Sequence, residues 1–200
     1  MKKIPTVFER DWNGDRSRVV NQVRPGCEWV LAGEGIATRK YDGSCCLIRD
    51  DKLYKRRELR PGGAPPSGFE YVDADPETGK SVGWVPVGDG PDDRWHREAL
   101  ANEGYLLIDG TYELLGPKVQ GNVEGRTQPV LQAHNLARTF PTAPRDFDGL
   151  RDWLAGQDIE GLVFHHPDGR MAKIKLRDFG LKRGIGVKEL VQDVDFHGSF

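Results

Sequence analysis

Apolar positions along the chain fall mostly in short runs of strand length. Residues 44–50 (SCCLIRD) and 52–59 (KLYKRREL) are predicted strands, joined by a hairpin turn at Asp50-Asp51. The apolar run at residues 29–33 (WVLAG) predicts a further strand ahead of them. These three segments surround the tetrapeptide Lys40-Tyr41-Asp42-Gly43, which is therefore predicted to form a turn between strands.

The second half of the chain contains three more predicted strands. Residues 104–116 (GYLLIDGTYELLG) have a strand pattern that is interrupted at Asp109-Gly110. Residues 159–166 (IEGLVFHH) and 170–178 (RMAKIKLRD) are predicted to form a hairpin around Pro167-Asp168-Gly169.

Helical patterns are fewer. Residues 91–102 (PDDRWHREALAN) predict a helix with Asp92 or Asp93 as its N-cap, and residues 146–156 (DFDGLRDWLAG) predict a second helix that ends at Gly156. Residues 61–91 are rich in proline and glycine, which predicts a long loop or a loosely paired excursion. Strands outnumber helices, so the sequence predicts an α+β fold with largely antiparallel pairing.

Length and charge bound the classes of protein that fit. The 200 residues suit a single domain, and the net charge of -2 gives no global attraction to a nucleic acid. Cations are nevertheless clustered: residues 171–188 hold six cations against one acid, and residues 52–60 hold five against one. A polyanion could therefore be attracted to one face of a nearly neutral protein.

Cysteine usage and hydropathy indicate a reducing, aqueous compartment. Three cysteines, two of them adjacent at Cys45-Cys46, cannot form a disulfide framework. The N-terminus has no apolar run typical of a signal peptide, and no stretch approaches the length of a membrane span. We expect a cytoplasmic protein without a membrane partner.

Four segments contain residues that could take part in catalysis or ligand binding. Alone, the Lys40 tetrapeptide fits a solvated surface turn. Glu113 and Glu160, however, lie in apolar strands, where a carboxylate is costly unless it is hydrogen-bonded or faces a polar site. Lys173 and Lys175 are two residues apart, which puts both on one face of a strand, although alone this pattern also fits a solvated edge strand.

Together these groups fit covalent catalysis at a phosphate. A lysine with the ordinary pKa of about 10.4 is protonated at neutral pH, so a nucleophilic lysine needs nearby cations or a metal ion that favour the neutral amine. Lys173, Lys175 and Arg56 could supply the cations, which would also neutralise a triphosphate. Magnesium binds through few carboxylates together with water and phosphate oxygens. The candidate carboxylates are Asp42, Glu113 and Glu160.

The order KYDG, YKRRE, YELLGP, EGLVF and KIKL resembles the successive motifs of the covalent nucleotidyltransferase superfamily of ligases and capping enzymes. The segment YELLGPKVQGN is similar to the RNA ligase branch, and the resemblance extends over about residues 38–177. It implies an antiparallel-rich α+β, ATP-grasp-like ligase core with the nucleotide in a cleft between sheets. By this resemblance, the catalytic residues are Lys40, Asp42, Glu160, Lys173 and Lys175, and the ATP contacts are Thr38, Lys40, Arg56 or Arg57, Glu113, Lys173 and Lys175.

The resemblance also implies individual roles. Lys40 would hold AMP as a phosphoramidate, Glu113 would hold the ribose, and Glu160 would help to position the metal ion. Such enzymes usually stack an aromatic ring on adenine between the third and fourth motifs. Here only His134 has a strand-like setting, and we interpret it as a buried, hydrogen-bonded histidine instead.

The expected activity is that of a stand-alone RNA ligase. Only 25 residues follow Lys175, too few for the oligonucleotide-binding (OB) barrel that DNA ligases and capping enzymes add. We expect an enzyme that uses ATP and Mg²⁺ or Mn²⁺, adenylates itself, passes AMP to an RNA 5′-phosphate and seals that end to a 3′-hydroxyl. Two alternatives stay open: a DNA ligase or capping-type core that acts with a separate partner chain, and a non-catalytic nucleotide- or RNA-binding module. The sequence does not fix the oligomeric state.

Overall fold

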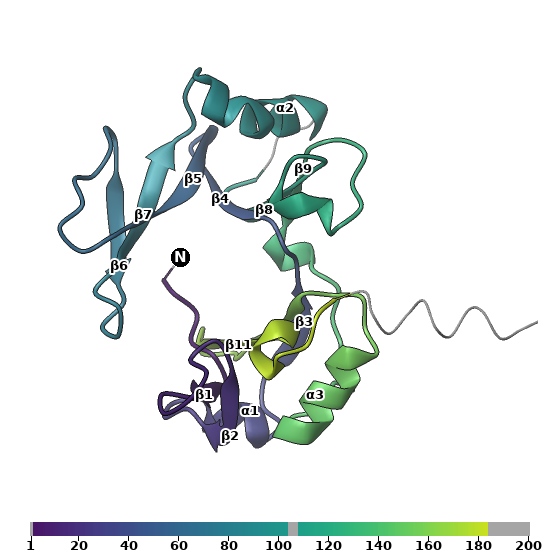
Figure 1. Ribbon diagram of the computed structural model, residues 1–200. Coiled ribbons are helices and arrows are strands. Elements are labelled where there is room, and N and C mark those ends of the chain that lie inside the picture. Colours follow the sequence, from purple (N-terminus) through teal and green to yellow (C-terminus); the bar gives the residue numbers. More distant parts are fainter. Residues whose placement is uncertain (1, 104–107, 184–200) are drawn as a thin grey trace, which may run out of the picture. The chain divides into compact units, whose positions relative to one another are not determined.

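The computed structural model describes residues 2–103 and 108–183, which form two compact units. Among the described residues, the large-sheet unit consists of 2–3, 41–103 and 108–137, and the small-sheet unit consists of 4–40 and 138–183. Every pairing between named strands is antiparallel and helices are few, so the fold is α+β, as the sequence predicts (Figure 1). The predicted single domain stays a prediction.

The large-sheet unit is built on a six-stranded sheet in the order β6-β7-β5-β4-β8-β9 (Figure 1). Its strands are β4 (Ser44–Arg49), β5 (Lys52–Leu59), β6 (Glu70–Ala74), β7 (Ser81–Pro86), β8 (Gly110–Leu115) and β9 (Val130–Ala133). The predicted hairpin of β4 and β5 is confirmed. Asp50 and Asp51 both have a positive φ, 51° and 57°, which is the backbone that a tight two-residue hairpin turn requires.

The first predicted helix is confirmed, although its start differs from the prediction. A 3-10 turn, η1 (Pro91–Asp93), leads into α2 (Arg94–Glu103), and Gly90 rather than Asp92 or Asp93 precedes the first turn without a side-chain cap. Asp93 does not cap because its carboxylate accepts from the Gly88 N–H at 2.8 Å and pairs with Lys55. Ala99 of α2 packs with apolar side chains from one face of the large sheet, which form one core with Cys46, Ile48, Leu53, Tyr112, Leu114, Val119 and Leu131.

The segment 61–91 is more ordered than a long loop. It contains β6 and β7, and β7 pairs along its whole length with β5. The buried run Val82–Val85 stabilises this pairing. The many prolines and glycines lie mainly in the connections, where they hid the strand signal. The second half of the unit also contains the short turns η2 (Gln120–Asn122) and η3 (His134–Leu136). Of the predicted strand 104–116, residues 104–107 lie outside the described residues.

The small-sheet unit is built on three strands in the order β11-β10-β3 and a two-stranded ribbon. The elements are β1 (Phe8–Arg10), β2 (Val19–Val23), α1 (Glu28–Leu31), β3 (Ile36–Lys40), α3 (Phe147–Ala155), β10 (Gly161–His165), β11 (Met171–Lys175) and η4 (Leu176–Phe179). The core of this unit combines one face of the three strands with α3 (Figure 1). Its fully buried members include Ala37, Leu150, Leu154, Leu162, Phe164 and Ile174.

The predicted strand at residues 29–33 is wrong, because this segment contains the helical turn α1. The Ala32 N–H donates to the Glu28 carbonyl at 3.0 Å, and Trp29 and Val30 are both buried although they are adjacent. Adjacent buried residues occur in short helices as well as in fully buried strands. A short apolar run in the sequence therefore does not distinguish a helix from a strand. Gly33, with a φ of 83°, follows the turn.

Two other predictions for this unit are confirmed. Asp146 is the N-cap of α3 and accepts from the Gly149 N–H at 2.8 Å, and Gly156 ends the helix. The hairpin of β10 and β11 turns at Pro167-Asp168-Gly169, and Gly169 has a φ of 91°.

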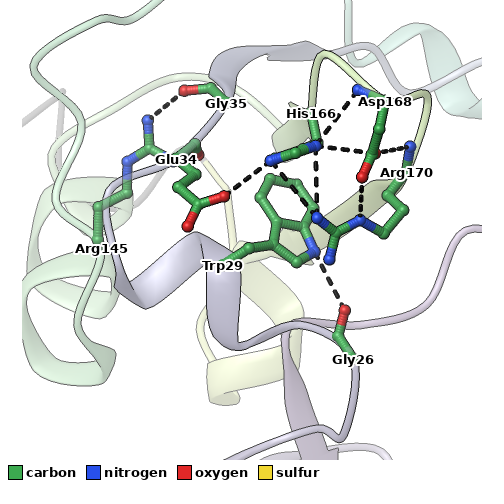
Figure 2. Close-up of polar contacts among 8 residues, drawn as sticks. All are labelled: Gly26, Trp29, Glu34, Gly35, Arg145, His166, Asp168 and Arg170. Carbon is green, nitrogen blue, oxygen red and sulfur yellow. Dashed lines mark hydrogen bonds and ion pairs between the residues drawn. The ribbon is translucent and has the colours of Figure 1, made fainter.

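A polar cluster around His166 joins this hairpin turn to the connection between α1 and β3 (Figure 2). His166 lies 2.8 Å from a carboxylate oxygen of Glu34 through Nε2 and 2.8 Å from Asp168 Oδ1 through Nδ1. Arg170 Nε donates to Asp168 Oδ2 at 2.7 Å, and its guanidinium lies over the ring of Trp29 (Figure 2). Since β10 pairs with β3, this cluster fixes the end of the small sheet opposite to Lys40.

Candidate functional site

Four of the predicted ATP-binding residues lie on one face of the small sheet. In the strand register, Lys175 pairs with Gly161, which pairs with Lys40 on the other side; Lys173 pairs with Val163, which pairs with Thr38. Side chains in one register row share a face, and residues two apart do as well. The prediction that Lys173 and Lys175 share a face is therefore confirmed, and Lys40 and Thr38 lie on that same face. We call it the lysine face.

Glu160 is the acceptor for both lysines of the first row. The Lys40 Nζ donates to Glu160 Oε2 at 2.6 Å, and the Lys175 Nζ donates to Glu160 Oε1 at 2.5 Å. Gly161 on the central strand adds no side chain between them. A Cβ there would lie 2.1 Å from the carbonyl oxygen of Ile174, so glycine permits the close approach of β10 and β11 at this point.

Burial makes this arrangement electrostatically strong. The side chains of Glu160, Lys175 and Lys40 are only 8%, 14% and 20% exposed. Burial acts to raise the pKa of Glu160, but the charges and hydrogen bonds of Lys40 and Lys175 outweigh it, and the pKa lies below its usual value. Burial lowers the pKa of Lys175, and the charge of Lys40 adds to the decrease against the opposing effect of Glu160. Lys175 is therefore not a solvated residue of an edge strand.

Asp178 fixes the backbone at Lys175. This carboxylate is almost fully buried, accepts from the Lys175 backbone N–H at 2.9 Å and pairs with Arg10 at 2.9 Å. Lys173 is fixed differently, because its N–H donates to the Pro5 carbonyl and its carbonyl accepts from the Val7 N–H. The sequence pointed to Asp178 only as the single acid of a cationic segment.

In the large-sheet unit, a row of side chains crosses the face opposite to α2. Glu113 on β8 pairs with Cys45 on β4 and with Gln132 on β9. Arg56 on β5 pairs with Trp84 on β7, and because its neighbour Lys55 pairs with Cys46, Arg56 shares this face with Cys45. We call this the Glu113 row.

Arg56 fits the predicted nucleotide contact better than Arg57. Its Nε and one Nη atom are buried and have no hydrogen-bond partner within the described residues. A buried guanidinium without an acceptor is costly, so this position suits a bound anion or another acceptor. Arg57 is exposed and, by alternation along the strand, lies on the opposite face.

Glu113 is hydrogen-bonded on both oxygens. Oε1 accepts from the Gly43 N–H at 3.1 Å, and Oε2 lies 3.0 Å from His134 Nε2. His134 Nδ1 in turn lies 3.0 Å from the Thr111 hydroxyl, so the histidine is hydrogen-bonded as predicted, but its side chain is 27% exposed and therefore only partly buried. A Cβ at Gly43 would lie 2.3 Å from the Leu114 carbonyl oxygen, which explains why glycine follows Asp42.

The predicted residues are thus divided between the two units. The small-sheet unit brings together Thr38, Lys40, Glu160, Lys173 and Lys175, and the large-sheet unit contains Asp42, Arg56, Arg57 and Glu113. Sequence reasoning missed two residues of the site, Thr111 and Glu124. The Glu124 carboxylate accepts from the Asp42 N–H at 3.1 Å. Across residues 2–103 and 108–183, no three His, Cys, Asp or Glu side chains gather as a metal-binding group.

In the described part of the chain, no helix combines the length and apolar character that a membrane span needs. No protein-family model matches the chain, and a comparison with curated proteins finds no significant relative.

Proposed function

We propose that the protein is a cytoplasmic, ATP-dependent RNA ligase that forms a covalent lysyl-AMP at Lys40. The observation that supports this most is the lysine face, where Lys40 and Lys175 share Glu160 across a glycine. A lysine so enclosed and paired is unusual for a surface turn, and perturbed titratable groups are typical of functional sites. The order of the five sequence motifs supports the same reaction.

In the proposed step the neutral amine of Lys40 attacks the α-phosphorus of ATP, after its proton has left to solvent. The N–P bond forms as the bond to pyrophosphate breaks, and the nitrogen then releases a second proton to solvent, which leaves the phosphoramidate. Lys173 and Lys175 neutralise the phosphate charge that builds up on the leaving group. Glu160 holds Lys40 by a hydrogen bond before the attack, which limits the positions that the amine can take.

The large-sheet unit contains two further candidate nucleotide contacts. Glu113 would accept from a ribose hydroxyl, and Arg56 would contact the nucleotide through its buried nitrogens. The carboxylates of Asp42, Glu113 and Glu160 are oxygen donors of the kind that Mg²⁺ or Mn²⁺ prefers. Such an ion, when bound, would neutralise phosphate oxygens. A metal ion at Glu160 would replace the contact of this carboxylate with either Lys40 or Lys175.

Mass spectrometry under denaturing conditions tests the covalent step. Incubation with ATP and Mg²⁺ is expected to add one acid-labile AMP, and peptide mapping is expected to place it on Lys40. Lys40→Ala should abolish the adduct while circular dichroism shows a folded protein. No adduct, or an adduct on a different lysine, would contradict the proposal. Preferential labelling by GTP would favour a capping-type enzyme instead.

The RNA assignment is tested with the adenylated enzyme. We expect joining of 5′-phosphorylated RNA, with a steep loss of binding as salt rises, because the cation clusters would contact phosphates. DNA is expected to be a poor 3′-hydroxyl strand, since only RNA offers the 2′-hydroxyl. Equal joining of all-DNA ends would favour a DNA ligase. RNA binding without any adduct would favour a non-catalytic module.

A further inference from the structure

The network of Thr111, His134 and Glu113 places a partly exposed histidine between a strand hydroxyl and a buried carboxylate. Glu113 is buried, and it sits in the middle of the Glu113 row on β8. A carboxylate only accepts hydrogen bonds, so with Glu113 as a carboxylate His134 Nε2 is the donor at the 3.0 Å contact. In the neutral imidazole Nδ1 is then the acceptor, and the Thr111 hydroxyl donates a hydrogen bond to it.

The network fixes one rotamer of Glu113. The Gly43 N–H holds Oε1 and the imidazole holds Oε2, so that rotation of the carboxylate would break at least one contact. Each carboxylate oxygen has two lone pairs, and these two contacts use one on each oxygen. Glu113 therefore still has acceptor capacity on both oxygens for a ligand. Its direction is set by His134.

We propose that His134 is a positioning residue that fixes Glu113 toward a ribose hydroxyl and thereby sets the preference of the protein for ribonucleotides over deoxynucleotides. This inference rests on the proposed function, because it takes ATP as the ligand. A carboxylate held in place discriminates more strongly than a mobile one, since a missing hydroxyl then leaves a buried acceptor unpaired.

The experiment compares the rate of lysyl-AMP formation with ATP, 2′-deoxy-ATP and 3′-deoxy-ATP, and in parallel the equilibrium affinity for each nucleotide. In the wild type one deoxy analogue should react about ten- to a hundredfold more slowly than ATP, the range expected for a hydrogen bond to a charged group. His134→Leu should lower the rate with ATP and leave the rate with that analogue nearly unchanged. The ratio between them should fall toward one.

Other variants separate positioning from a general structural role. His134→Gln should restore most of the preference, because its amide can donate to Glu113, and Thr111→Val should lower it partly. Glu113→Gln should abolish the preference, and His134→Leu should then have no further effect. His166→Leu in the polar cluster of Figure 2 is the matched control and should leave the preference intact.

The outcomes distinguish this inference from the proposed function. If the wild type forms an adduct but His134→Leu changes all three rates equally or not at all, the inference is wrong and the ligase proposal stands. If the wild type binds ATP without an adduct, the ligase proposal is wrong. The inference then stands only if His134→Leu lowers the ratio of the affinity for ATP to the affinity for the deoxy analogue. If the protein binds no nucleotide, both are overturned. Should His134→Leu fail to fold, His134→Gln and Thr111→Val provide the same comparison.

Discussion

A single carboxylate shared by two ammonium groups makes the residues of the lysine face unequal in their effect on stability. Glu160 accepts from Lys40 and from Lys175, whereas the backbone N–H and carbonyl of Lys173 are bonded to Pro5 and Val7. Removing Lys175 leaves a buried carboxylate with one of its two cations. Removing Lys173 leaves both of these contacts to Glu160 in place.

We therefore expect Lys175→Met to lower the free energy of unfolding by about 1–3 kcal/mol, as for a buried charge that loses a partner. Lys173→Met should lower it by less, because both contacts to Glu160 remain, although both variants should slow self-adenylation strongly. Urea unfolding gives the stabilities. The double variant Lys175→Met with Glu160→Gln should recover part of the loss, because the uncompensated charge is gone. Equal losses for Lys173→Met and Lys175→Met would argue against the shared carboxylate.

The sequence predicted the identity of these residues better than their contacts. The spacing of Lys173 and Lys175 sets their common face, because alternation is local. The contact of Lys40 with Glu160 spans 120 residues, and no local pattern determines it. For the same reason His134 could be predicted as hydrogen-bonded, but its partners Thr111 and Glu113 could not.

At the level of elements, turn chemistry was the most informative signal. The boundaries of β5 were predicted correctly because Asp50-Asp51 ends one strand and begins the next. The wrong strand at residues 29–33 had no such signal, since α1 has only four residues. Strands β6 and β7 were predicted as a long loop or a loosely paired excursion, because the proline and glycine of their connections gave a stronger sequence signal than the short buried run in β7.

The turn between β10 and β11 should weaken in acid. The Arg170 backbone N–H and, after it, the side chains of Arg170 and His166 lower the pKa of Asp168 from 3.8 to about 2. A carboxyl whose pKa is lower in the folded state stabilises the protein above its unfolded pKa and loses this effect as the pH falls through its folded pKa. Asp168→Asn should therefore lower the urea midpoint at neutral pH, and the difference should vanish near pH 2.

The matched control for Asp168 is Asp89→Asn, an exposed acid in a connection of the other unit. This variant should shift the urea midpoint little at any pH. A difference between Asp168→Asn and wild type that persists unchanged into acid would contradict an ionic role for Asp168.

For the whole molecule, the main feature is that the small-sheet unit is discontinuous in sequence. Its strand β3 precedes Tyr41–Ala137, and its partners β10 and β11 follow that segment. Closing the small sheet therefore requires the ends of a long segment to meet, which costs less conformational entropy once the segment has folded. Sequence reasoning placed β10 and β11, but it predicted a strand at residues 29–33 in place of β3, and it did not predict this order of units.

We expect the two units to unfold together, as the predicted single domain requires. Trp84 and Trp95 report on the large-sheet unit, and Trp12, Trp29 and Trp153 report on the small-sheet unit. We would make two variants, each with the tryptophans of one unit replaced by phenylalanine. In each variant the urea midpoint measured by fluorescence should equal the midpoint measured by circular dichroism on the same protein. Separate midpoints would show two domains.

The alternation of side chains along β4 has a practical consequence for thiol chemistry. Cys46 is fully buried and Cys27 nearly so, and burial raises the pKa of both thiols, which suppresses their reaction with alkylating reagents. Cys45 is only partly buried and lies beside Glu113 in the Glu113 row. The natural sequence thus already contains one preferred position for a fluorescent or spin label on that face, and a ligand that covers the row would protect this thiol from the reagent.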